Sequence, residues 1–158
     1  MKQFVPRADR RRMGLYFAAI CTWLALTGIS RLPGATIREI DENSDGVTDQ
    51  WIEIIDSTTT RITKDRDFDG RPDYSMVYDE RARKISESLD FNFDGQMDDF
   101  YYYVGGVLKR REIDTDFDGR VDLWVSLFEG VYLSRVERDL DGDGEIDFVK
   151  EYILGSDE

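Results

Sequence analysis

Short runs of aromatic and β-branched residues recur along the chain, and turn signals follow them. The five runs are 51–55, 74–78, 100–104, 123–128 and 148–153. Each has the length and composition of a β-strand. The pairs Gly105-Gly106 and Glu129-Gly130 each precede a returning run of mixed polarity, at 107–113 and 131–136. Two residues that include glycine, placed between two such runs, predict a β-hairpin.

Between successive hairpins the chain repeats one polar motif, Asp-x-Asp/Asn-x-Asp-Gly-x-x-Asp, five times. The copies, called loops 1 to 5 below, span residues 41–49, 65–73, 90–98, 114–122 and 139–147. Their glycines are 24, 25, 24 and 25 residues apart, which indicates a repeat architecture. A lone hairpin is marginal in water, so neighbouring repeats must share their apolar faces. We therefore predict an all-β fold of five β-hairpin repeats. They would form an antiparallel meander or solenoid of about nine strands, with the polar loops along one edge and the turns along the other.

The first 30 residues follow a different pattern. Lys2, Arg7 and 10–12 are basic, 13–26 is apolar, and the small residues Gly28 and Ser30 come next. This order predicts a hydrophobic helix that serves as a secretory signal peptide. An uncleaved anchor is the alternative, because 13–30 just reaches spanning length; either way the remainder is exported. The expected division is 1–30 signal peptide or uncleaved anchor, 31–40 linker or cap, 41–154 five repeats, and 155–158 polar tail.

The composition restricts the chemistry further. The chain has 34 acidic and 21 basic residues, a net charge of −13, no histidine, and one cysteine, Cys21, inside the predicted signal peptide. Ser-His-Asp and Cys-His catalysis and histidine metal sites are therefore excluded, as are disulfides after cleavage. A surface with this much negative charge repels nucleic acids and anionic membranes, and it attracts cations. We expect no nucleic-acid partner, and membrane contact only through an uncleaved N-terminal segment.

The repeated loop has the donor spacing of a calcium site. Calcium takes about six to eight oxygen ligands, and carboxylates at positions 1, 3 and 5 of a tight loop can converge on one ion. Glycine at position 6 permits the sharp turn, while the carbonyl of position 7 and the carboxylate of position 9 close the other side. One isolated copy could be an ordinary Asx turn, but five copies in register crowd carboxylates that need a cation to neutralise them. Magnesium is disfavoured because it demands a smaller octahedral shell. The predicted ligands, for up to five calcium ions, are Asp41, Asn43, Asp45, Asp49, Asp65, Asp67, Asp69, Asp73, Asp90, Asn92, Asp94, Asp98, Asp114, Asp116, Asp118, Asp122, Asp139, Asp141, Asp143 and Asp147.

This loop resembles the calcium loops of EF-hands, dockerins, thrombospondin type-3 repeats and FG-GAP repeats. An EF-hand has a bidentate glutamate at position 12, where this chain has Ile52, Met76, Tyr101, Val125 and Lys150. The flanks are strand-like rather than helical, and the period is too short for a four-stranded propeller blade. The chain is most similar to bacterial exported proteins built from short EF-hand-like hairpin repeats. That resemblance implies calcium and export, and no reaction.

The function that follows is an exported, non-catalytic calcium-binding repeat protein with a structural or adhesive role. The protein would be secreted, periplasmic or attached to the cell surface. In addition to calcium, its expected partner is a cell-surface protein or polysaccharide. The alternative is a carbohydrate- or protein-binding module that uses exposed aromatics, namely Trp51, Trp124 and 101–103. A carboxylate-pair enzyme is disfavoured, because most aspartates occupy repeated ligand positions. The acids outside the motif are expected in turns or on solvated faces: Asp56, Asp79 and Asp99.

Two other loop positions carry expectations. Phe68, Phe93 and Phe117 stand at position 4, which has no ligand role, and they are expected to pack between successive loops. Position 7 varies in residue type, so only its backbone is expected to contribute.

Overall fold

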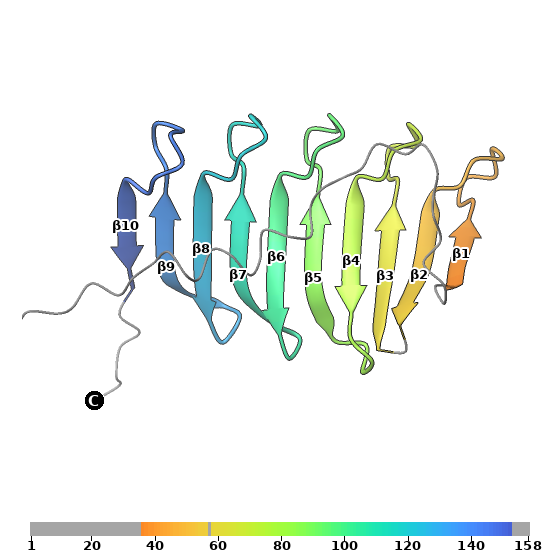
Figure 1. Cartoon of the computed structure of the whole chain (residues 1–158), viewed down its shortest axis with the longest axis horizontal. Helices are drawn as coiled ribbons and strands as arrows, with labels where there is room; N and C mark the ends of the chain where they lie inside the picture. The colour runs from red at the N-terminus through yellow and green to blue at the C-terminus, as the bar shows by residue number, and fades with distance from the viewer. Residues whose placement is uncertain (1–35, 57, 153–158) are drawn as a thin grey trace, which may run out of the picture. The chain divides into compact units, whose positions relative to one another are not determined.

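The described residues form one sheet of ten antiparallel strands, in which every strand pairs with its neighbours in sequence. The computed structural model describes residues 36–56 and 58–152. The strands are β1 (Thr36–Ile40), β2 (Gln50–Asp56), β3 (Thr59–Lys64), β4 (Tyr74–Tyr78), β5 (Lys84–Leu89), β6 (Asp99–Val104), β7 (Val107–Ile113), β8 (Leu123–Phe128), β9 (Tyr132–Arg138) and β10 (Phe148–Glu151). They lie side by side in chain order (Figure 1). The predicted all-β antiparallel meander is thereby confirmed.

Strand β1 was not counted from the sequence. It lies in the segment 31–40, expected as a linker or cap, and pairs with β2 from Thr36↔Ile54 to Ile40↔Gln50. Strands were counted after each loop, whereas a loop that joins antiparallel neighbours also needs a strand before it. The predicted signal peptide at 1–30, the first half of the linker and the tail at 155–158 lie outside the described residues.

The two kinds of connection lie at opposite edges of the sheet, as expected. The acidic loops follow β1, β3, β5, β7 and β9, and the short turns follow β2, β4, β6 and β8 (Figure 1). Both predicted glycine turns have two successive residues with positive φ: Gly105 at 61° and Gly106 at 85°, and Glu129 at 54° and Gly130 at 77°. This is the backbone of a type I′ turn, whose twist matches that of the flanking strands.

No apolar side chain among the described residues is buried. Because the described strands form a single layer, each strand side chain has neighbours from that layer on its sides but none above it. The eight buried residues in the described part of the chain are all aspartates, and they lie in or beside the loops: Asp49, Asp65, Asp73, Asp90, Asp98, Asp99, Asp114 and Asp139. Cross-strand pairs, rather than an enclosed core, therefore hold the sheet together.

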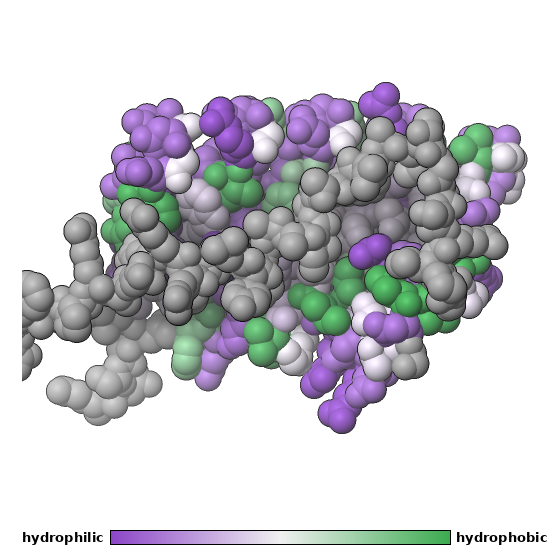
Figure 2. Space-filling view, in the orientation of Figure 1, coloured by the Kyte–Doolittle hydropathy of each residue, from purple (hydrophilic) through white to green (hydrophobic). Residues whose placement is uncertain are grey.

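The strand register divides the side chains between two faces. One face carries the row Ile52, Ile62, Met76, Glu87, Tyr101, Arg111, Val125 and Val136, and is called the apolar face. The other carries the row Trp51, Thr63, Ser75, Ser88, Phe100, Glu112, Trp124 and Glu137, and is called the mixed face. Figure 2 shows hydrophilic residues along the loop edge and hydrophobic ones over the strands.

Two polar clusters interrupt the apolar face. Glu87 accepts hydrogen bonds from Tyr74, from the Tyr103 hydroxyl at 2.9 Å and from the Lys84 ammonium at 2.7 Å. Burial opposes ionisation of Glu87, but these three donors together hold its pKa below the usual value of 4.5.

The second cluster centres on Asp99, the first residue of β6. Arg111 donates to its two carboxylate oxygens at 2.8 and 2.5 Å, and Tyr101 donates to it at 2.9 Å. The expectation of a turn or a solvated face is wrong for Asp99, which is only 1% exposed, because a bidentate arginine compensates its burial. Asp79 does lie in the turn after β4, where it accepts the backbone N–H of Arg83, and Asp56 is the exposed last residue of β2, where it accepts the backbone N–H of Thr58.

Candidate cation-binding loops

All five loops have the same backbone course. The glycine at position 6 has a φ of 93°, 90°, 93°, 87° and 89° in loops 1 to 5. This left-handed conformation favours glycine, as predicted. Position 4 is left-handed as well, with Ser44 at 64°, Phe68 at 63°, Phe93 at 59°, Phe117 at 62° and Gly142 at 75°. The left-handed backbone of position 4 was not predicted, and the glycine in loop 5 was the one signal for it in the sequence.

Carboxylates of the motif hold this course by accepting backbone N–H groups. In loop 2, Asp65 at position 1 accepts from Phe68 and Gly70, both at 2.7 Å. Asp73 at position 9 accepts from the N–H of Arg66 at 2.6 Å. Asp69 at position 5 accepts from Arg71 at 2.8 Å. The same bonds to positions 1, 5 and 9 recur in the other four loops.

Three of the five loops bring acidic oxygens together. Positions 1, 3 and 9 each offer one carboxylate oxygen, all within 4.8 Å of one another, in loops 2, 4 and 5: Asp65, Asp67 and Asp73; Asp114, Asp116 and Asp122; Asp139, Asp141 and Asp147. These groups could hold metal ions. Position 5 lies outside these groups. Loops 1 and 3 have Asn43 and Asn92 at position 3, whose amides donate to Asp45 and Asp94 instead.

Repulsion and burial both act on these carboxylates. The pKa of Asp67 is raised by desolvation and by the neighbouring charges of Asp69 and Asp65. The pKa of Asp116 is raised for the same two reasons, its neighbours being Asp118 and Asp114. A cation at the centre of each group would reverse the repulsion, because an opposite charge favours the ionised form.

Successive loops are joined to one another. In each of the four junctions the backbone N–H of position 1 donates to the carbonyl of position 9 in the preceding loop: Asp65 to Asp49 at 2.8 Å, Asp90 to Asp73 at 2.9 Å, Asp114 to Asp98 at 2.8 Å, and Asp139 to Asp122 at 3.0 Å. These contacts bury the position 1 aspartates of loops 2 to 5. Asp41, which has no preceding loop, is exposed.

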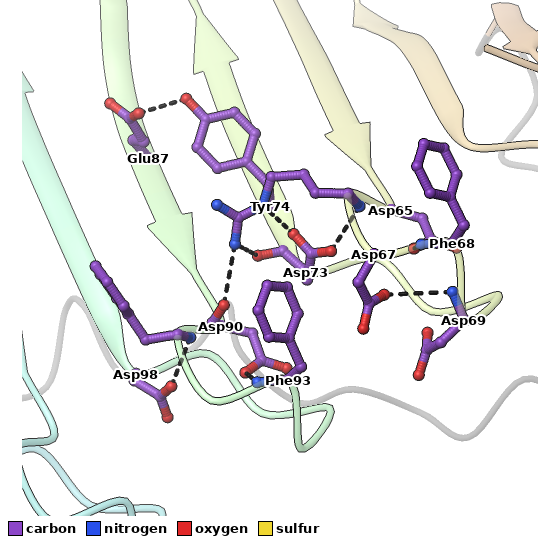
Figure 3. A network of polar contacts seen from close by, with 12 residues as sticks. Asp65, Asp67, Phe68, Asp69, Asp73, Tyr74, Glu87, Asp90, Phe93 and Asp98 are labelled. Atoms are coloured by element: carbon purple, nitrogen blue, oxygen red, sulfur yellow. Dashed lines mark hydrogen bonds and ion pairs between the residues drawn. The ribbon is translucent and has the colours of Figure 1, made fainter. Parts of the chain in front are cut away.

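Side chains also make contacts between successive loops, and these contacts were not predicted from the sequence. Arg66 pairs with Asp73 and donates to the Asp90 carbonyl of the next loop at 3.0 Å, and its guanidinium lies 5.5 Å from the ring centres of Tyr74 and Phe93. Figure 3 shows Phe93 beside this network. Phe93 therefore contacts the preceding loop through Arg66. The expectation that the position 4 rings are packed between loops is not met, because Phe68, Phe93 and Phe117 are 48%, 45% and 44% exposed. At position 7, Arg120 reaches the Gly142 carbonyl at 3.2 Å, so this position contributes more than its backbone.

Comparisons with known proteins assign no family. No family model and no curated protein matches the chain. A search of solved structures finds a chain from "Crystal structure of accessory secretory protein 1,2 and 3 in Streptococcus pneumoniae", with 16% identity and a TM-score of 0.40. The match covers 66% of this chain and 19% of that one, and a likeness at this level carries no argument about fold or function.

The described part of the chain, 36–56 and 58–152, contains no helix of the length and apolarity needed to cross a membrane.

Proposed function

We propose that the protein is an exported, non-catalytic calcium-binding repeat protein in which calcium stabilises the sheet. The observation that carries this proposal is the convergence of carboxylates from positions 1, 3 and 9 in loops 2, 4 and 5. The protein's role would be structural or adhesive, and it would bind a cell-surface protein or polysaccharide.

The donor set favours calcium over other ions. The loops offer only oxygen ligands, which suit hard cations, and no histidine or cysteine stands in any of them. Each oxygen of Asp65 accepts one backbone N–H and still has a lone-pair site to offer a cation. Position 5 would complete the shell by turning its second oxygen inward. Loops 1 and 3 would bind in the same way through the amide oxygens of Asn43 and Asn92.

Calcium binding of this kind would be structural rather than regulatory. Without a bidentate glutamate at position 12, we expect dissociation constants on the order of 10⁻⁴–10⁻³ M, as in extracellular modules. At about 1 mM calcium and a dissociation constant near 0.1 mM, mass action gives roughly 1.4 kcal/mol per site, or about 7 kcal/mol for five sites. That equals the whole stability of many small domains, at about 5–15 kcal/mol.

Calorimetric titration of the chain with calcium tests the proposal. A triple variant, Asp67→Asn, Asp116→Asn and Asp141→Asn, gives every loop the asparagine that loops 1 and 3 already have, so the backbone is expected to be kept. Calcium affinity should fall by about an order of magnitude at three sites, because fewer ligand charges weaken a calcium site. The matched control is Asp56→Asn, Glu80→Gln and Glu129→Gln, which removes three charges from the opposite edge. Equal affinities of the two variants would reject the acidic triads as the sites.

The register favours a second candidate function, a binding surface on the mixed face. It places Trp51, Phe100 and Trp124 in one row, with the small Ser75 and Ser88 between the first two. Aromatic rings beside small hydroxyls suit a polysaccharide chain. Of the run 101–103, residues 101 and 103 lie on the apolar face, where their hydroxyls bond Asp99 and Glu87, so that run is not a single ladder.

A further inference from the structure

The two ends of the sheet are complementary halves of one repeat. Each internal repeat has a strand after its loop and a strand that returns to the next loop. Strand β10 follows loop 5 and has no returning partner among the described residues, whereas β1 leads into loop 1 and is the first strand that the structure describes. Figure 1 shows these two strands at opposite ends of the row. Since strands alternate in direction, a β1 placed beside β10 would run antiparallel to it and continue the meander.

Backbone groups at the two edges match this arrangement. Tyr152 donates to the Ser134 carbonyl, so by the antiparallel alternation the N–H groups of Val149 and Glu151 point away from β9. At the other edge Asp49 donates to the Ile40 carbonyl, so the N–H groups of Ile37 and Glu39 point away from β2. Within residues 36–56 and 58–152, each edge therefore presents an unpaired set of donors and acceptors to an added strand.

The loops provide a second match at the same joint. Each internal junction has a position 1 N–H that donates to a position 9 carbonyl. Within the described residues, the position 1 N–H of Asp41 and the position 9 carbonyl of Asp147 are the two that have no such partner. Both side chains are exposed, whereas Asp65 and Asp73 inside the array are buried.

We propose that copies of this chain associate head to tail, with β10 of one copy pairing with β1 of the next and Asp41 N–H donating to the Asp147 carbonyl. The register of the internal repeats places Phe148, 42% exposed, opposite Ile40 of the second copy on the apolar face. Because different edges meet, the contact is heterologous and generates a linear array or a ring. The proposal rests on the repeat geometry and stands apart from calcium binding.

One cross-strand pair at this joint is unfavourable and limits its strength. Lys150 faces Arg38 of the second copy on the same face, and like charges directly opposite each other destabilise a strand pair. The association of the native chain is therefore weak and rises with concentration. This pair is a non-hydrogen-bonded one, with Cα atoms about 4.5 Å apart, a separation that a disulfide accommodates.

Disulfide trapping tests the arrangement in the full chain, with Cys21→Ser as the background. Arg38→Cys and Lys150→Cys chains are mixed and oxidised in calcium buffer, and the linked peptides are identified by mass spectrometry. The expected product is a dimer joining position 38 to position 150, several-fold more abundant than dimers from either chain alone. The matched control pairs Lys150→Cys with Glu39→Cys, which lies on the opposite face of β1.

Three results would overturn the proposal: no dimer above the control, equal dimers from each variant alone, or trapping that survives Val149→Pro. The proline removes an outward N–H of an edge strand, where it leaves the internal ladder intact.

Lys150→Glu gives a test without covalent capture, because it places opposite charges across the joint. The Lys150→Glu variant should have a higher average mass in sedimentation equilibrium than the unsubstituted chain. An unchanged average mass would contradict the pairing. None of these results depends on the calorimetric titration, so the two proposals can fail separately.

Discussion

At the scale of single residues, carboxylates are the structural residues of this protein. Asp65 shapes its loop with bonds to Phe68 and Gly70, and Asp99 fixes Arg111 and Tyr101 on the sheet. Glu87 gathers two tyrosine hydroxyls and a lysine on β4 to β6. A buried ionised group is tolerated where hydrogen-bond donors surround it, and each of these sites supplies at least two donors.

The lowered pKa of Glu87 predicts a pH-dependent contribution to stability. A carboxyl group whose pKa is lowered in the folded state stabilises the fold above its unfolded pKa, here about 4.5, and this contribution is lost as the pH falls through the folded pKa. Glu87→Gln should lower the free energy of unfolding at pH 7 by about 1–2 kcal/mol. The difference from the unsubstituted chain should shrink towards pH 3. Urea unfolding at both pH values, in saturating calcium, measures it, and a difference independent of pH would contradict the assignment.

The sequence predicted the loop carboxylates better than their partners. Spacing alone identified positions 1, 3 and 9, whose carboxylates converge in loops 2, 4 and 5, because nine consecutive residues determine a loop locally. It also predicted position 5, which lies outside these groups. The left-handed Phe93 could not be predicted, since phenylalanine does not favour that conformation. The burial of Asp99 also escaped prediction, because it depends on Arg111, a residue 12 positions away that β-pairing brings next to it.

At the scale of elements, the turn edge is packed as closely as the loop edge. A Cβ on Gly130 would lie 2.9 Å from the Cγ1 atom of Val107 in the preceding hairpin. A Cβ on Gly106 would likewise lie 3.3 Å from the Cβ atom of Arg83. Successive hairpins therefore touch at both ends of their strands, which fixes their spacing.

Substitution at two turn glycines separates contact from backbone strain. Gly130→Ala adds a clash with Val107 to the cost of an alanine at positive φ, and should destabilise the fold by about 2–3 kcal/mol. Gly105→Ala is the matched control: its φ is 61° and nothing lies within 4 Å of the added carbon. It should cost about 1 kcal/mol. Chemical denaturation of both variants gives the difference, and equal losses would show that the hairpins do not pack at this edge.

Element positions followed closely from the sequence. β4 and β8 coincide with the aromatic runs at 74–78 and 123–128, and β7 with the returning run at 107–113. These strands have aromatic and β-branched composition although no described apolar side chain in them is buried, so the runs were visible in the sequence. β1 was not counted, because five polar and apolar residues before the first loop carry no turn signal of their own.

At the scale of the whole molecule, the described sheet has no enclosed apolar core, and its buried side chains are acidic. Folding alone therefore concentrates negative charge along the loop edge without an apolar interior to offset the repulsion. Five cations bound between carboxylates would neutralise that edge and tie each loop to its strands. Bound calcium would thus stabilise this sheet in the way that a hydrophobic core stabilises a two-layer domain.

Thermal unfolding followed by circular dichroism, first in millimolar calcium and then in excess chelator, tests this account most directly. If calcium stabilises the sheet, the protein should show a β-type spectrum with a cooperative transition in calcium, and a transition at much lower temperature, or partial unfolding, once calcium is removed. Magnesium at the same concentration should restore less of the stability. A melting temperature that is the same with calcium and with chelator would contradict the account and leave the five loops as plain turns.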